Sequence, residues 1–111
     1  MNVLMINDNK YIINEMKECF RNNNSEFYYA DSTEYAIKLL SKYKMDKVII
    51  DLNSISTAGL IKYINDNFKD IKVLLTAENQ IEEAISVFKN GNYKLLSNPI
   101  KLQELKEIIN H

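Results

Sequence analysis

Short apolar runs alternate along this chain with longer segments whose apolar residues recur at helical spacing. Residues 3–6 (VLMI) form a continuous apolar tetrad, which is typical of a strand buried on both faces of a sheet. Further runs of this kind occur at residues 27–30, 48–50, 73–75 and 95–96. The pattern therefore predicts five short, buried strands.

The segments between these runs have the three- and four-residue spacing of amphipathic helices. The polar run at residues 22–25 ends the first helix, and Asp31 with Glu34 resembles a capping box that starts the second. Asn79 with Glu82 predicts the start of the fourth helix in the same way. The apolar positions that define the five helices are Ile12, Met16, Cys19 and Phe20; Ala36, Leu39, Leu40 and Tyr43; Leu60, Ile61, Ile64 and Phe68; Ile81, Ala84, Ile85 and Phe88; and Leu102, Leu105, Ile108 and Ile109.

Strands and helices alternate from end to end, and no hairpin turn signal joins one strand to the next. This order predicts an α/β fold of three layers, in which helices cover both faces of a mostly parallel sheet. A chain of 111 residues has the usual size of one domain, so residues 1–111 are expected to form a single unit.

Composition and charge limit the kinds of molecule that this chain is expected to bind and the compartment in which it is expected to work. The formal net charge is −1 and the lysines are scattered, which gives no electrostatic reason to expect nucleic-acid binding. No apolar run is long enough to cross a membrane, and no signal peptide is recognisable. Cys19 is the only cysteine, which favours a reducing compartment. We therefore expect a cytoplasmic domain that binds neither nucleic acid nor membrane.

Polar residues follow four of the predicted strands. Ligands of open parallel sheets bind beyond the carboxyl ends of the strands, so these residues are the candidates for chemistry. They are Asn7 and Asp8, Asp51, Thr76 and Ala77, and Ser97 and Asn98. Asp8 taken alone could be a helix N-cap, and Asp51 taken alone could be an ordinary loop residue. Two carboxylates at one edge of the sheet instead favour a site for a hard cation such as Mg²⁺.

The spacing of these residues resembles the receiver domain of bacterial response regulators. That family has an acidic pair after the first strand, a phosphorylated Asp after the third, a Thr or Ser ending the fourth, and Lys-Pro after the fifth. The corresponding residues here are Asn7-Asp8, Asp51 with Gly59 eight residues later, Thr76-Ala77, and the segment from Gly91 to Pro99. The resemblance covers the whole chain and implies a flavodoxin-like sheet of order 2-1-3-4-5 with five flanking helices.

The resemblance also implies roles for these residues. Asp51 would be the phosphoacceptor, served by a sensor histidine kinase or a phosphotransfer protein. Asp8 and Asp51 would bind Mg²⁺, together with the backbone carbonyl of Asn53 and with Asn7 as the other member of the pair. Thr76, Ala77 and Asn98 would contact the phosphoryl group and carry the conformational switch. Receivers of this family also often form homodimers.

This chain departs from the family pattern at the switch and at the metal site. Asn98 replaces the usual Lys, Asn7 replaces an acidic residue, and Leu95 replaces an aromatic switch residue. The amide of Asn98 can still donate a hydrogen bond but carries no charge. Two readings therefore remain: a phosphoacceptor with an altered switch, or a degenerate receiver that acts as a phosphorylation-independent interaction module.

Enzyme and flavin functions are disfavoured. A phosphatase of the haloacid dehalogenase type would need a second acid where Asn53 stands, and the loop after the first strand lacks the small hydroxyl residues of a flavin phosphate site. We therefore expect a domain that is not an enzyme.

The two Asn replacements leave the charge of the site at −2, the value of a usual receiver, because one carboxylate and one Lys are lost together. Since Mg²⁺ affinity rises with nearby negative charge, Asn7→Asp should tighten Mg²⁺ binding and Asn98→Lys should weaken it. The double variant should bind Mg²⁺ about as the wild type does, as measured by Mg²⁺ titration. An unchanged affinity in Asn7→Asp would contradict this charge compensation.

Overall fold

Five parallel strands form one sheet in the computed structural model, which describes residues 1–22, 24–51, 58–77, 93–97 and 107. The strands are β1 (Asn2–Ile6), β2 (Glu26–Ala30), β3 (Lys47–Asp51), β4 (Lys72–Ala77) and β5 (Tyr93–Ser97). Their order in the sheet is β2-β1-β3-β4-β5, and every neighbouring pair is parallel. The predicted α/β class and strand order are confirmed.

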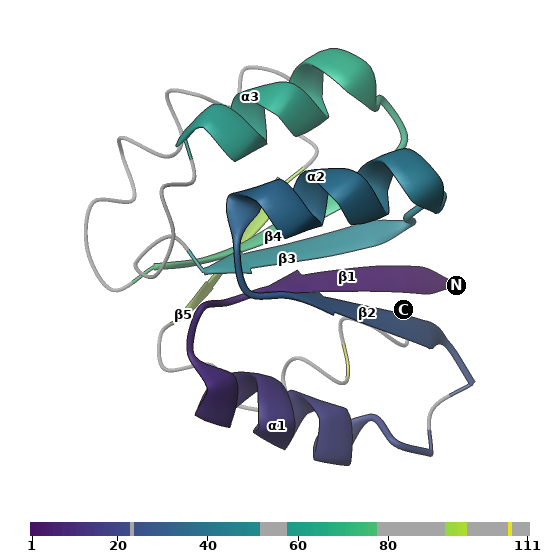
Figure 1. Cartoon of the computed structure of the whole chain (residues 1–111), viewed down its shortest axis with the longest axis vertical. Coiled ribbons are helices and arrows are strands. Elements are labelled where there is room, and N and C mark those ends of the chain that lie inside the picture. Colours follow the sequence, from purple (N-terminus) through teal and green to yellow (C-terminus); the bar gives the residue numbers. More distant parts are fainter. Residues whose placement is uncertain (23, 52–57, 78–92, 98–106, 108–111) are drawn as a thin grey trace.

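Helices lie on both faces of the sheet. In Figure 1, α2 (Thr33–Lys42) and α3 (Ala58–Asn67) cover one face, while α1 (Lys10–Cys19) covers the other. These positions give the three layers that the sequence predicts. The fourth and fifth predicted helices, at residues 81–88 and 102–109, lie outside the described residues except for Glu107, which is helical.

The hydrophobic core is divided by the sheet into two clusters. Along β1, Leu4 and Ile6 point toward α2 and α3, whereas Val3 and Met5 point toward α1. All four side chains are at most 2% exposed, because successive residues of a strand face opposite sides and both sides are covered. The tetrad is thus buried on both faces, as predicted.

The N-cap of α2 differs from the predicted one, and the N-cap of α1 is not the residue named as an alternative. Ser32, not Asp31, caps α2: its backbone is extended and its side chain accepts a hydrogen bond from the backbone N–H of Tyr35. Asn9, not Asp8, caps α1 and accepts from the backbone N–H of Tyr11. In each case a good capping residue stands one position nearer to the helix than the acid does.

The two ends of β3 have different electrostatic environments. Lys47 begins the strand, is 5% exposed, and is paired in register with Lys72. Burial is the main cause that lowers the pKa of Lys47, and the neighbouring Lys72 lowers it further. The other end of the strand is Asp51, paired in register with Thr76. The cationic end therefore lies at the amino edge of the sheet and the anionic end at the carboxyl edge.

The buried face of α3 gives a test of the packing. Ile64 is 1% exposed and packs in the cluster beneath α2 and α3, whereas Lys62 on the same helix is exposed. Ile64→Ala should lower the free energy of unfolding by about 2–5 kcal/mol, since it removes buried methyl groups and leaves a cavity. Lys62→Ala should change it by less than about 0.5 kcal/mol. Urea unfolding of both variants measures the difference, and equal effects would contradict the assignment of the buried face.

Candidate functional site

The carboxyl ends of β1, β3 and β4 bring the candidate residues together. Asp51 is the last residue of β3, is partly buried, and is the register partner of Thr76. Ile6 is paired with Ile50, so the next residue after β1, Asn7, lies opposite Asp51. Asp51 and the Thr76-Ala77 pair are within their strands rather than after them, because the β3–β4 and β4–β5 ladders continue through these positions.

Asn7 is held at this edge by hydrogen bonds to three neighbouring segments. It is 4% exposed, and its backbone N–H donates to the carbonyl of Ala30 at 3.0 Å. Its side-chain Oδ1 accepts from the backbone N–H of Asn9 at 2.8 Å. Its Nδ2 donates to Oδ2 of Asp51 at 3.3 Å. Asn7 therefore connects the ends of β1, β2 and β3 to the start of α1.

Asn9 is a site residue that the sequence analysis missed. Its side chain caps α1 and its backbone N–H holds the side chain of Asn7. The signal was present in the run Asn7-Asp8-Asn9, because Asn is among the best N-cap residues and stands directly before the first helical residue. The capping role had been considered for Asp8 alone.

Asp8 is exposed and lies between these two constrained asparagines. Because Asn9 is the N-cap of α1, Asp8 does not have the capping role that the sequence left open for it. The structure describes only the backbone of Thr76 and Ala77, which lie beside Asp51 and Ser97 respectively. Asn98 and Asn53 lie outside the described residues, so their predicted roles remain predictions.

The acidic residues present fit a magnesium ion held largely by water. Within the described residues no group of three or more His, Cys, Asp or Glu side chains could hold a metal. Mg²⁺ needs fewer protein ligands than this, because it commonly binds through one or two carboxylates and keeps several waters. Asp51 at the sheet edge and the exposed Asp8 match that donor set. They would hold the ion, and the amide of Asn7 would contact the same carboxylate.

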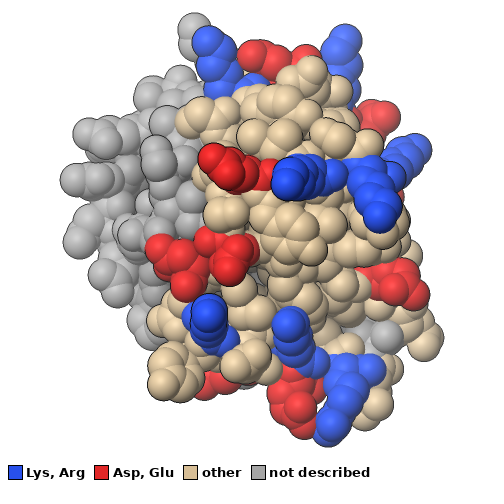
Figure 2. Space-filling view, viewed as in Figure 1, with Lys and Arg blue, Asp and Glu red and all other residues tan. Residues whose placement is uncertain are grey.

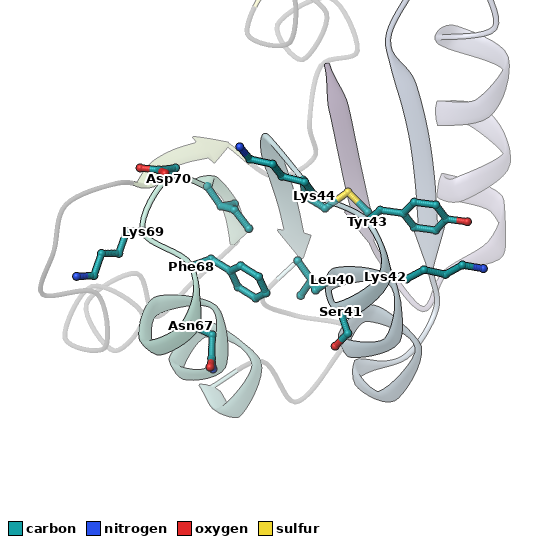
Figure 3. Close-up of a pocket in the computed structure, with 11 residues that line it drawn as sticks. Leu40, Ser41, Lys42, Tyr43, Lys44, Asn67, Phe68, Lys69 and Asp70 are labelled. Carbon is teal, nitrogen blue, oxygen red and sulfur yellow. The ribbon is translucent and has the colours of Figure 1, made fainter.

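A pocket of about 390 Å³ lies at the opposite edge of the sheet. It is formed where α2 leads into β3 and where α3 leads into β4 (Figure 3). Leu40 and Phe68 line its apolar part, while Lys42 and Lys69 point away from it. It is therefore separate from the site at Asp51.

Charges of both signs are interspersed on the molecular surface. On the face shown in Figure 2, the described Lys and Arg side chains alternate with Asp and Glu side chains. Among the described helices, none has the length and apolar character needed to cross a membrane.

Several solved structures of receiver domains have the same fold. The receiver domain of the Francisella response regulator 1452 matches with a TM-score of 0.83 and 24% identity, covering 98% of this chain and 93% of that one. A CheY-like receiver domain protein from Methanospirillum hungatei matches with a TM-score of 0.85 and 13% identity, covering 98% and 90%. The receiver domain of an HD domain-containing protein from Pseudomonas fluorescens matches with a TM-score of 0.85 and 18% identity, with the same coverage. At these identities the similarity establishes the fold.

Sequence comparison establishes the family. The heme response regulator HssR of Staphylococcus aureus is 24% identical over 104 residues, which are 92% of this chain. The chain spans about half the length of this curated relative, 46%. The family model of the response regulator receiver domain matches residues 3–110. With this match, the parallel sheet and the acidic edge, the chain belongs to the response regulator receiver domain family.

Proposed function

We propose that Asp51 accepts a phosphoryl group from a sensor histidine kinase or a phosphotransfer protein in the cytoplasm. The observation that carries this proposal is the position of Asp51: a partly buried carboxylate at the carboxyl edge, hydrogen-bonded by Asn7 and paired in register with Thr76. The domain is in this view a phosphorylated signalling component rather than an enzyme with its own substrate.

Phosphoryl transfer to Asp51 requires the protein mainly to position the reacting groups and to offset their negative charge. An oxygen of the Asp51 carboxylate attacks the phosphorus of the donor and forms an acyl phosphate. The bond from phosphorus to the donor nitrogen breaks, and its electron pair leaves with the imidazole of the phosphohistidine. Catalysis of phosphoryl transfer is mainly positioning and electrostatic stabilisation, and Asn7 contributes to the first by restraining the carboxylate.

Magnesium would supply the missing positive charge at this site. Bound by Asp8, Asp51 and the carbonyl of Asn53, it would offset the charges of the carboxylate and the phosphoryl oxygens. Asp8 is suited to this role because its side chain is exposed and does not cap α1.

The response to phosphorylation differs from that of a complete receiver. Asn98 can donate a hydrogen bond to the phosphoryl group but cannot form an ion pair with it. Leu95 has neither an aromatic ring nor a hydroxyl group, so it lacks the chemical groups of the usual aromatic switch residue. The switch is therefore altered, and the competing function is a phosphorylation-independent interaction module.

Phosphoryl transfer from a small donor tests the proposal. Incubation with acetyl phosphate and Mg²⁺ should add one phosphoryl mass to the wild-type chain, because Asp51 is the carboxylate placed to accept it. Asp51→Asn should abolish the adduct, and intact-mass spectrometry detects it.

Asp70→Asn is the matched control. Asp70 is exposed and precedes β4, at the opposite edge of the sheet from Asp51. This variant should be labelled as the wild type is. Failure to label the wild type under conditions that label an ordinary receiver would instead support the interaction-module function.

The altered switch gives a second test. Beryllofluoride, which mimics the phosphoryl group, should cause smaller and more local amide shifts in NMR spectra than it does in a complete receiver. The physical reason is the joint loss of the Lys at Asn98 and of the aromatic residue at Leu95. Large shifts extending through the predicted fourth helix and β5 would show that another route carries the signal.

A further inference from the structure

The orientation of the Asn7 amide is determined by its neighbours on both sides. A backbone N–H only donates, so the atom of Asn7 that faces Asn9 must be the acceptor Oδ1. The remaining nitrogen, Nδ2, then points at Asp51, whose ionised carboxylate only accepts. Asn is the residue that satisfies both neighbours, because its amide carries one acceptor and one donor group.

An acidic residue at the same position would not satisfy both neighbours. One oxygen of an Asp could accept from Asn9, but the other would face Oδ2 of Asp51 across the 3.3 Å that the Asn7 nitrogen spans now. Two acceptors would then meet with no hydrogen between them, at a position where the side chain is 4% exposed and water is largely excluded. Only a bound cation could hold such a pair together while both carboxylates stay ionised.

We propose that Asn7 is a positioning residue whose amide holds the Asp51 carboxylate in place of a cation, so that the site is organised before any metal binds. The inference concerns the same site as the proposed phosphoryl acceptance but does not depend on it. Its expected signature is a fold whose stability depends on Mg²⁺ less than that of a variant with an acidic residue at position 7.

Thermal unfolding of four proteins tests this, in chelator and in 1 mM Mg²⁺, with no phosphoryl donor present. In chelator, Asn7→Asp should lower the Tm by on the order of 5–10 °C, because a charge-assisted hydrogen bond becomes a contact between two carboxylates. Mg²⁺ should raise the Tm of this variant by roughly 5 °C or more, and that of the wild type by less than half as much. If Asn7→Asp is unfolded in chelator, Mg²⁺ should restore its far-UV circular dichroism.

The reversed pair provides the discriminating variant. In Asn7→Asp/Asp51→Asn, the new carboxylate can accept from both Asn9 and the amide at position 51. This rebuilds the donor–acceptor pair in the opposite direction. The Tm of the double variant in chelator should return to within about 3 °C of the wild type, and its response to Mg²⁺ should be small.

Asn22→Asp controls for the added charge alone. Asn22 is exposed and follows α1. Its substitution should change the Tm by less than about 2 °C in either buffer.

Two results would overturn the proposal. One is a double variant no more stable in chelator than Asn7→Asp, because the contact between positions 7 and 51 would then not be what Asn7 supplies. The other is a wild type stabilised by Mg²⁺ as strongly as Asn7→Asp. Neither depends on whether acetyl phosphate labels Asp51, so failure of phosphoryl acceptance and failure of this inference are distinguishable.

Discussion

The parallel register between β1 and β3 is the constraint on which the site depends. Because Ile6 pairs with Ile50, the first residue after β1 lies beside the last residue of β3. A slip of one residue would turn Val3 and Met5 toward α2 and α3 and would turn Leu4 and Ile6 toward α1, so neither core cluster would keep its packing. The core therefore determines the register, and the register determines that Asn7 meets Asp51.

Burial explains why the contact between Asn7 and Asp51 has to pair a hydrogen-bond donor with an acceptor. Asn7 and Lys47 are the buried polar residues of the described part of the chain, and no buried side-chain nitrogen or oxygen there is left without a partner. The side chain of Asn7 achieves this with two hydrogen bonds, to Asn9 and to Asp51, and its backbone N–H donates a third to Ala30. Its contact with Asp51, at 3.3 Å, is slightly longer than an ideal N–H···O bond. The bond to Ala30 thus fixes the backbone of Asn7, the bond from Asn9 fixes its side-chain oxygen, and the contact with Asp51 is directed by them.

The sequence predicts the fold better than it predicts the site. Continuous apolar runs such as residues 3–6 identify buried strands because burial on both faces leaves no polar position. The placement of Asp8, Asp51 and Thr76 at one edge followed from the parallel order. The cap of α2 was predicted one residue too early, at Asp31, and Asn9 was not considered as a cap of α1, since the composition of a polar run does not say which member has extended backbone. The summed charge of the site could be counted from the sequence, but the direction of the Asn7 amide depends on a backbone N–H that only the folded turn presents.

Hydrogen bonds through Asn7 connect Asp51 to the β1–β2 side of the sheet. From Oδ2 of Asp51 they run through Asn7 to the backbone of Asn9, where α1 begins, and to the carbonyl of Ala30 at the end of β2. In a complete receiver the signal is expected to leave on the other side, through the Thr of β4 and the aromatic residue of β5. The proposed function expects this second route to be weaker here, because Leu95 and Asn98 replace the aromatic residue and the Lys. Any group that binds Oδ2 of Asp51 must share it with Nδ2 of Asn7 or displace this nitrogen, whose amide also accepts from the N–H of Asn9. The start of α1 is therefore joined to Asp51 by the same amide that holds the carboxylate.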